Sequence, residues 1–423
     1  MILLISAVLA DATPRTFTPS LDPASSFAEI ASGGDVAWQG DAAAPQPAIE
    51  SPVHAAAMAR TVPATIASDC SKDVTTALNA WMASVADGST LHFRAGDCYR
   101  VDGTLMLRDR HDLTVDGNGA LFAASVVPPA SPKITRQMWS VVGGDGITIR
   151  NMGIRGTNPT ATFDVRREWF PLIQIAGSRQ VLIDGVRGSN AWGDFVSIGP
   201  DTRRVTRSNG TGAVMPKNVL VRRSSATVIG RHGVTCNGCE NIRVDGNVFR
   251  NVAYQIFDIE VEADTWYARN VAFTNNTIGG RVKLSVLANA GMGRDVTNIT
   301  VRGNVMTSTP VTCAPPIQVD DTAAVKSNFV LTNNRFKTLG NAFWLRGVSD
   351  VTVADNAVTF ENGGCRNAGV AVFATSGHGI AITNNDFSGA RRLVQVGTTA
   401  TVTACGNRLS GSGFDQPQPC GAT

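Results

Sequence analysis

Two acidic residues, Asp258 and Glu260, alternate with apolar residues in the segment Phe257-Asp-Ile-Glu-Val261. If this segment is a strand, the alternation places the apolar side chains in a core and both carboxylates on the opposite face. Residues two apart on a strand have Cβ atoms about 7 Å apart. Two carboxyl groups at that spacing raise the pKa of one of them, which prepares an acid beside a base. The segment therefore predicts a site that can hydrolyse a glycosidic bond.

Two basic residues, Arg281 and Lys283, lie one repeat further along the chain and are predicted to face the same side as the acids. They would either take part in the chemistry of the site or only neutralise the acidic pair. An exposed ion pair of the second kind contributes roughly 0 to 1 kcal/mol and no chemistry. We predict catalytic roles for Asp258, Glu260 and Lys283, and we keep the structural ion pair as the alternative.

Glu262 and Asp264 follow the pair and make four acids within seven residues. Carboxylate oxygens are the ligands that Ca²⁺ prefers in proteins. A calcium-dependent lyase would use the ion to neutralise a uronate carboxylate, and Lys283, Arg281 or Tyr254 to remove the α-proton. No EF-hand loop is present. We therefore expect hydrolysis without a cofactor and keep Ca²⁺-dependent β-elimination as the alternative.

Long insertions at residues 157–171 and 199–218 flank two of the predicted strands. Loops on a rigid scaffold commonly build binding sites, so we expect these two to wall a groove over the middle of the repeat. Aromatic residues there would stack on sugars and arginines would bind an acidic sugar; packing and simple solvation are the alternative roles. The predicted substrate-binding residues are Arg166, Arg167, Trp169, Arg203, Arg231, Tyr254, Trp266 and Arg281.

A repeat that ends in Asn runs through the chain after residue 100. Segments such as Ile242-Arg-Val-Asp-Gly-Asn247 and Phe329-Val-Leu-Thr-Asn-Asn334 recur every 22 to 30 residues from Asn247 onward, and Asn118 aligns with them. Each unit holds two or three short strands and no helix-length segment, which predicts an all-β, right-handed parallel β-helix of about 11 coils. Stacked coils lie about 4.8 Å apart, so the Asn side chains can bond to one another as an internal ladder.

Composition divides the chain into four parts. Residues 1–10 are apolar and are predicted as a signal peptide, and residues 11–68 form an Ala- and Pro-rich arm of low complexity. The β-helix domain is expected at residues 69–415. It begins with an amphipathic helix at 73–86 that caps the exposed strand edges of the first coil. A tail at 416–423 follows.

Eight cysteines without zinc-finger spacing predict disulfides and an oxidising compartment, so we expect a secreted or cell-surface protein. The expected pairs are Cys70–Cys98, Cys313–Cys365, Cys405–Cys420 and a local bridge between Cys236 and Cys239. The 37 basic and 34 acidic residues give a net charge of +3 without a block of like charge. No apolar run approaches the roughly 18 to 20 residues of a membrane span. We expect no nucleic-acid or membrane partner and leave the oligomeric state open.

The segment Asp73–Trp81, followed by Phe93-Arg-Ala-Gly-Asp-Cys-Tyr-Arg-Val101, resembles the entry of the pectate-lyase-like β-helix superfamily. That entry has a capping helix and then a strand pair of the type Phe-Pro-Ala-Gly-x-Tyr, in which Arg94 replaces the proline. The resemblance covers roughly residues 69–415. It implies a right-handed parallel β-helix that acts on polysaccharides or binds them, as phage tailspikes do, because fold alone does not decide function.

Three short segments are similar to motifs of the polygalacturonase-type glycoside hydrolases: Gly193-Asp194-Phe195, Arg231-His232-Gly233 and Arg281-Val282-Lys283. The similarity implies Asp194 as an acid, His232 as its proton partner, and Arg281 with Lys283 as ligands of a substrate carboxylate. Phe195 stands where the first motif has a second Asp.

Asp258 or Glu260 from the next coil is the expected replacement for that missing acid. We therefore predict an exported enzyme that hydrolyses the glycosidic bonds of a polysaccharide with acidic sugars. A polysaccharide lyase and a non-catalytic, tailspike-like glycan-binding protein are the alternatives. The predicted catalytic residues are Asp194, His232, Asp258, Glu260 and Lys283.

Overall fold

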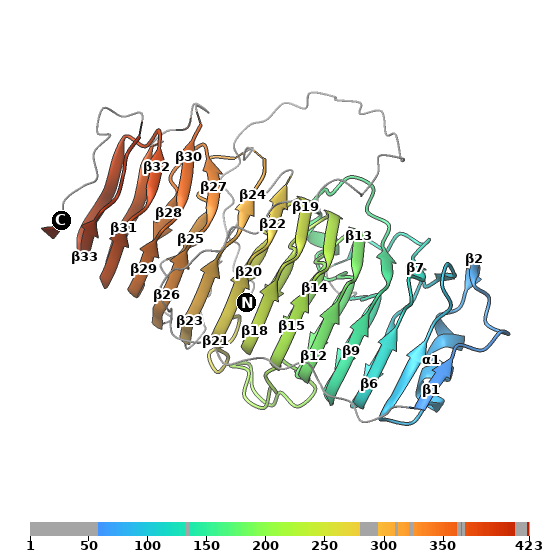
Figure 1. Ribbon diagram of the computed structural model, residues 1–423. Coiled ribbons are helices and arrows are strands. Elements are labelled where there is room, and N and C mark those ends of the chain that lie inside the picture. Colours follow the sequence, from blue (N-terminus) through green and yellow to red (C-terminus); the bar gives the residue numbers. More distant parts are fainter. Residues whose placement is uncertain are drawn as a thin grey trace. The chain divides into compact units, whose positions relative to one another are not determined.

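The computed structural model describes residues 58–131, 135–279, 295–308, 312–320, 325–361, 365, 369–410 and 421–422. Most of them form parallel strands that coil around one hydrophobic core, in the right-handed parallel β-helix that the repeat predicts (Figure 1). Each strand pairs with the equivalent strand of the next coil. The coils are therefore held together by backbone hydrogen bonds along three faces.

The first sheet has 16 strands among the described residues. Its 14-residue strand β31 pairs with both β28 and β29, which joins two faces of the last coils into one sheet. The strands are β1 (Met58–Thr61), β3 (Ser89–His92), β6 (His111–Asp116), β9 (Asp145–Arg150), β12 (Arg179–Asp184), β15 (Lys217–Arg222), β18 (Cys239–Asp245), β21 (Ala268–Thr274), β23 (Asp295–Arg302), β26 (Val325–Thr332), β29 (Ser349–Ala354), β31 (Val370–Thr383), β33 (Arg392–Cys405), β34 (Gly421–Ala422), β25 (Ile317–Val319) and β28 (Phe343–Leu345).

The other two sheets have 12 and six strands. The second sheet contains β2 (Asp69–Asp73), β4 (Cys98–Arg100), β7 (Leu121–Ala123), β10 (Gly153–Arg155), β13 (Arg187–Ala191), β16 (Ser225–Ile229), β19 (Val248–Val252), β22 (Thr277–Gly279), β24 (Val305–Met306), β27 (Arg335–Thr338), β30 (Ala357–Phe360) and β32 (Asp386–Ser388). The third contains β5 (Leu105–Arg108), β8 (Trp139–Val142), β11 (Ile173–Ala176), β14 (Val196–Gly199), β17 (Val234–Cys236) and β20 (Phe257–Ile259).

The predicted capping helix is present as α1 (Thr75–Ser84), which is shorter at both ends than the predicted 73–86. Leu78 and Met82 lie one turn apart on its buried face, at 0% and 1% exposure. They belong to the same hydrophobic core as the strands that follow. The helix therefore covers the apolar end of the first coil (Figure 1).

Two predicted boundaries are wrong. The arm does not extend to residue 68, because β1 pairs in parallel with β3 and the side chains of Val62 and Ile66 are buried in the core. The predicted tail at 416–423 also contains a strand, because β34 pairs antiparallel with β33. Low complexity in the sequence thus hid one strand at each end.

The internal Asn ladder is confirmed. In the coil of β21 and β22, Asn275 has a φ of +56° and the next residue, Asn276, is 1% exposed. The Oδ1 of Asn276 accepts hydrogen bonds from the backbone N–H and the amide of Asn247 (2.9 and 3.1 Å), while its Nδ2 donates to the Val244 carbonyl and to Asn304 Oδ1 (3.0 Å each). The ladder comprises Asn247, Asn276, Asn304, Asn334, Asn356, Asn385 and Asn407.

This turn explains the two-residue signature of the repeat. The first residue needs the left-handed region, which Gly and Asn enter at low cost, and the second needs an amide that can both donate and accept. Asn118 was predicted as a ladder member, but it is exposed with a φ of +49°, and Ala120 takes the ladder position. The first polar member is Ser224, whose backbone N–H donates to Asn247 Oδ1 (2.9 Å).

A second Asn ladder, which we did not predict, runs along the outside at the start of the first-sheet strands. Each Nδ2 donates to the Oδ1 of the Asn in the preceding coil at 2.7 to 3.0 Å. All five members have φ between 55° and 59°. They are Asn218, Asn241, Asn270, Asn298 and Asn328.

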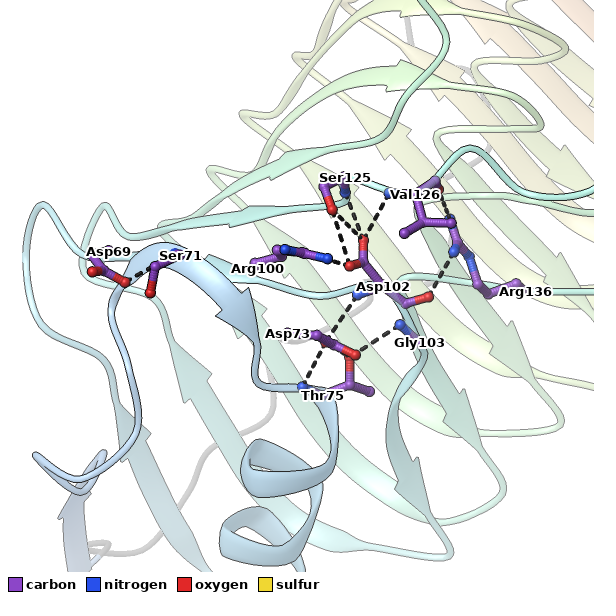
Figure 2. Close-up of polar contacts among 10 residues, drawn as sticks. All are labelled: Asp69, Ser71, Asp73, Thr75, Arg100, Asp102, Gly103, Ser125, Val126 and Arg136. Atoms are coloured by element: carbon purple, nitrogen blue, oxygen red, sulfur yellow. Dashed lines mark hydrogen bonds and ion pairs between the residues drawn. The ribbon is translucent and has the colours of Figure 1, made fainter.

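Asp102 ties the capping helix to the first coils (Figure 2). Its backbone N–H donates to Asp73 Oδ1 (3.2 Å), just ahead of α1. Its carboxylate accepts hydrogen bonds from Arg100 Nε (2.6 Å) and from the backbone N–H groups of Ser125 (2.7 Å) and Val126 (2.9 Å). Burial raises the pKa of Asp102, but these donors outweigh it and hold that pKa below its usual value.

Three predicted disulfides are present. Cys70–Cys98, Cys313–Cys365 and Cys236–Cys239 have Cα separations of 5.0, 5.7 and 5.9 Å. The fourth predicted pair, Cys405–Cys420, includes Cys420, which lies outside the described residues. In the part of the chain that the structure describes, no helix is both long and apolar enough to cross a membrane.

The internal ladder predicts the effect of Asn334→Ala. Loss of the amide leaves buried partners in two neighbouring coils unpaired, so the free energy of unfolding should fall by about 2 to 4 kcal/mol. Asn298→Gly removes an exposed amide at a positive φ that glycine accepts, and should cost less than about 1 kcal/mol. Denaturant unfolding measures both variants. Equal stability of Asn334→Ala and the wild type would contradict the ladder.

The lowered pKa of Asp102 predicts a pH-dependent contribution to stability. A carboxyl group with a depressed folded-state pKa stabilises the fold above its unfolded-state pKa, and that contribution disappears as pH falls through the folded value. Asp102→Asn should therefore lower the free energy of unfolding at pH 7 by about 1 to 3 kcal/mol and have little effect below about pH 3. Asp112→Asn, on an exposed residue, is the control. A pH-independent loss would refute the charge-based explanation.

Candidate functional site

A cleft of about 370 Å³ lies along the outer face of the third sheet. Its floor includes Ser140 on β8, Gln174 on β11 and Ser197 on β14, which occupy paired positions in successive coils. Their neighbours along each strand point into the core, as the period of two requires. The Oγ of Ser140 donates to Gln174 Oε1 at 3.1 Å. The floor is therefore a flat, polar surface on a rigid sheet.

Both predicted insertions border this cleft. Trp169 of the first and Arg203 of the second line it, together with Trp266, which follows β20. Gly193 allows the first insertion to approach, because a Cβ there would lie 2.3 Å from the Glu168 carbonyl oxygen. The Trp266 Nε1 donates to the carbonyl of Gly210 in the second insertion (3.4 Å). The predicted walled groove is thus present.

Asp194 lies at the bottom of the cleft, two residues before β14, and is 1% exposed. The backbone N–H of His232 donates to its Oδ1 (3.1 Å), and Thr235 Oγ1 donates to its Oδ2 (2.9 Å). Burial raises the pKa of Asp194 to about 6, although Arg231 and these donors act in the opposite direction.

Three further carboxyl groups line the same cleft, those of Glu168, Asp201 and Glu262. Burial, followed by the negative charge of Glu260, raises the pKa of Glu262 to about 7. Burial also raises the pKa of Glu168. All three residues were absent from the predicted catalytic set. The alternation that singled out Asp258 and Glu260 continues to Glu262 and would have identified it.

Arg231 joins these acids from behind the cleft. It is 6% exposed, and its guanidinium contacts Glu260 (Nη2–Oε2, 2.9 Å), Asp194 (Nη1–Oδ2, 3.5 Å) and Glu168 (Nε–Oε2, 3.6 Å). It also lies over the Trp169 ring at 5.4 Å. Burial lowers the pKa of Arg231, but the surrounding carboxylates raise it further, so the group stays cationic.

Asp258 faces away from the core, as predicted, but it is 1% exposed and does not line the cleft. Its Oδ2 lies 3.5 Å from His232 Nε2, which is equally buried. The side-chain amide of Gln255 is oriented so that both its oxygen and its nitrogen have partners. In this orientation its nitrogen donates to His232 Nδ1 (3.0 Å) and to Asp258 Oδ2 (3.0 Å). The His232 ring lies 5.3 Å from the ring of Tyr254. These residues form a packed cluster beside the cleft.

One ligand atom each from His232, Asp258 and Glu260 lies within 4.8 Å of the other two. This donor set includes an imidazole nitrogen, and its Glu260 already pairs with Arg231. Ca²⁺ prefers six to eight oxygen ligands, so the trio fits that ion poorly. The calcium alternative stays a prediction.

Three of the predicted substrate-binding arginines, those in the two insertions, have acidic partners. Arg203 pairs with Asp109 (2.7 Å) and Asp201 (2.7 Å), and Arg166 and Arg167 both pair with Asp164. The three guanidinium charges are therefore balanced by carboxylates of the chain itself.

The structure thus brings Asp194, Trp169, Arg203 and Trp266 together in the cleft, with Arg231 and Glu260 behind it. Tyr254 lies outside and stacks on Phe163 (5.4 Å). Arg281 and Lys283 lie outside the described residues. Their catalytic and substrate-binding roles stay predictions.

Comparison with known proteins finds a family model of the right-handed β-helix region that matches residues 205–387. No match is found among curated proteins. Three similar solved structures have low sequence identity to this chain. They are a family 28 exopolygalacturonase of Yersinia enterocolitica (TM-score 0.60, 12% identity, 82% of this chain and 78% of that one), a hyperthermoactive exopolygalacturonase of Thermotoga maritima (0.55, 13%, 84% and 92%) and the tailspike of E. coli bacteriophage HK620 in complex with a pentasaccharide (0.56, 13%, 82% and 64%).

Identities this low show likeness of fold alone. The matches agree with the stacked parallel sheets described above. The chain therefore has the fold of a right-handed parallel β-helix, which these solved structures share.

Proposed function

We propose that the protein is a glycoside hydrolase that cleaves a polysaccharide in the cleft over the third sheet. The observation that carries the proposal is a pair of acids, Asp194 and Glu262, in one cleft walled by Trp169 and Trp266, where burial raises the pKa of Asp194 to about 6 and that of Glu262 to about 7. Glycosidases use two carboxyl groups, one of them kept protonated by a raised pKa, and this pair can supply both groups. Exopolygalacturonases share the fold, which is consistent with this chemistry.

The higher of the two raised pKa values favours Glu262 as the acid. Near pH 6.5 Glu262 is mainly protonated and can donate its proton to the departing glycosidic oxygen. Asp194 is mainly ionised and can activate a water molecule or attack the sugar. Arg231 holds Asp194 and Glu260 in place, and the His232–Asp258 cluster supports the floor from the side. Asp258 and Glu260 thus become positioning residues in this proposal.

We further propose that the protein works outside the cell or on its surface. Three disulfides in the described residues favour an oxidising compartment. The partner is then a soluble or surface-bound polysaccharide.

Asp194→Asn and Glu262→Gln test the assignment. Each variant should lower kcat on a cleaved polysaccharide by about 10²- to 10⁴-fold, since each removes one proton-transfer group. Release of reducing ends over a panel of polysaccharides measures the effect. Glu262→Gln should keep or raise the melting temperature, because the amide replaces a carboxyl group whose ionisation burial and the charge of Glu260 disfavour.

Glu240→Gln is the matched control, because Glu240 is a partly buried acid of the first sheet outside the cleft. Its turnover should stay within about twofold of the wild type. Loss of turnover in Asp258→Asn or Glu260→Gln, with Asp194→Asn and Glu262→Gln active, would return the site to the sequence-based assignment. A product that absorbs as an unsaturated uronate would indicate a lyase, and binding without any product would indicate a glycan-binding protein.

The two pKa values predict a bell-shaped pH profile. Activity should fall as pH decreases through about 6, because Asp194 must be ionised, and as pH increases through about 7, because Glu262 must be protonated. The kcat/KM of the wild type from pH 4 to 9 checks this expectation. A plateau that continues to pH 9 would exclude Glu262 as the acid.

A further inference from the structure

The cleft is lined by neutral polar groups and by more acids than bases. Among the described residues that line it, the charged side chains are Glu168, Asp194, Asp201, Glu262, Arg108 and Arg203. Arg203 is already paired with Asp109 and Asp201. Arg231, just behind the cleft, is paired with three acids. Arg108 is the one further guanidinium of this lining, in which carboxyl groups outnumber guanidinium groups by four to two, so a polyuronate chain would meet more acids than bases.

Asn237 is the most informative neutral group. It directly follows β17, lines the cleft and is 7% exposed. Its backbone N–H donates to the Ile198 carbonyl (2.8 Å), and the Cys236–Cys239 disulfide closes the turn around it. Its side-chain Oδ1 is buried and has no hydrogen-bond partner among the described residues. Buried polar atoms are rarely left without a partner, so this acceptor calls for a donor from a bound molecule.

The rest of the lining suits the same kind of molecule. Ser140, Gln174 and Ser197 offer hydroxyl and amide groups along the floor. Trp169 and Trp266 offer apolar faces at the walls. Sugar rings present hydroxyl groups at their rims and C–H groups on their faces, so they match both sets of groups.

We propose that the cleft is selective for uncharged sugars, neutral or N-acetylated, and that Asn237 Oδ1 is a specificity-determining acceptor for a sugar hydroxyl or acetamido N–H. This inference rests on the proposed glycan site, and it replaces the acidic substrate expected from the arginines, which the structure shows paired with acids. The experiment reads binding separately from cleavage.

Affinity electrophoresis of the full chain tests the charge class. The gels contain dextran, galactomannan or soluble N-acetylated chitosan as uncharged probes, and polygalacturonate or alginate as acidic probes. We expect retardation by at least one uncharged probe, little changed between 50 and 500 mM NaCl because no ion pair is involved. Retardation only by the acidic probes, or by none of the five, would overturn the proposal.

Asn237→Ala tests the acceptor. The variant should bind the retarding probe about tenfold more weakly, as loss of one directed hydrogen bond implies. Asn341→Ala is the matched control, because Asn341 also has a buried Oδ1 without a described partner but does not line the cleft. Its binding should equal that of the wild type. Unchanged binding by Asn237→Ala, or equal losses in both variants, would overturn the role of Asn237.

The two proposals can fail separately. Binding of an uncharged probe without release of reducing ends would keep the selectivity and refute the hydrolase. Hydrolysis of polygalacturonate with Asp194 and Glu262 required would keep the hydrolase and refute the selectivity. If an uncharged probe is cleaved, Asn237→Ala should raise KM more than it lowers kcat, whereas a merely destabilised variant would lower the active fraction alone.

Discussion

Each coil turns from the first sheet into the second, and the buried backbone groups of that turn need hydrogen-bond partners. The way in which those partners are supplied constrains the rest of the stack. From Ser224 onward, the backbone N–H of each ladder residue donates to the side-chain oxygen of the ladder Asn in the next coil. The side-chain nitrogen of each ladder Asn donates in turn to a backbone carbonyl of the preceding coil. The buried polar groups are satisfied only when the coils are in register. A one-residue slip would break both kinds of bond, so the ladder sets the register of the coils that contain it, from Ser224 onward.

In the earlier coils, which hold most of the cleft, the parallel strand pairing itself sets the register. Because paired positions repeat coil after coil, Ser140, Gln174 and Ser197 form one row on the outer face. Long insertions are tolerated between strands since they leave this pairing intact, and Gly193 allows the first insertion to lie against Asp194. Burial under that insertion, more than any single charge, raises the pKa of Asp194.

Repeats, alternation and cysteine spacing were sufficient to predict the fold. These patterns were insufficient to predict which residues of the site are buried. Asp258 does face away from the core, yet other residues of the protein bury it to 1% exposure. The local sequence pattern contains no information about that burial. The arginines of the insertions were expected to meet substrate, but Asp109 and Asp164, remote or adjacent in sequence, pair with them first. Asn118 matches the repeat in sequence, but the ladder position of its coil is occupied by Ala120, two residues later.

The cleft draws its lining from residues 106–266, and none of the described residues of the later coils contributes to it. Those later coils carry most of the Asn ladder and end in β33 and β34. In a solenoid each coil contacts only its neighbours, so a coil there can be gained or lost without disturbing the cleft. The length of the stack can therefore change in steps of about 4.8 Å per coil while the cleft keeps its geometry.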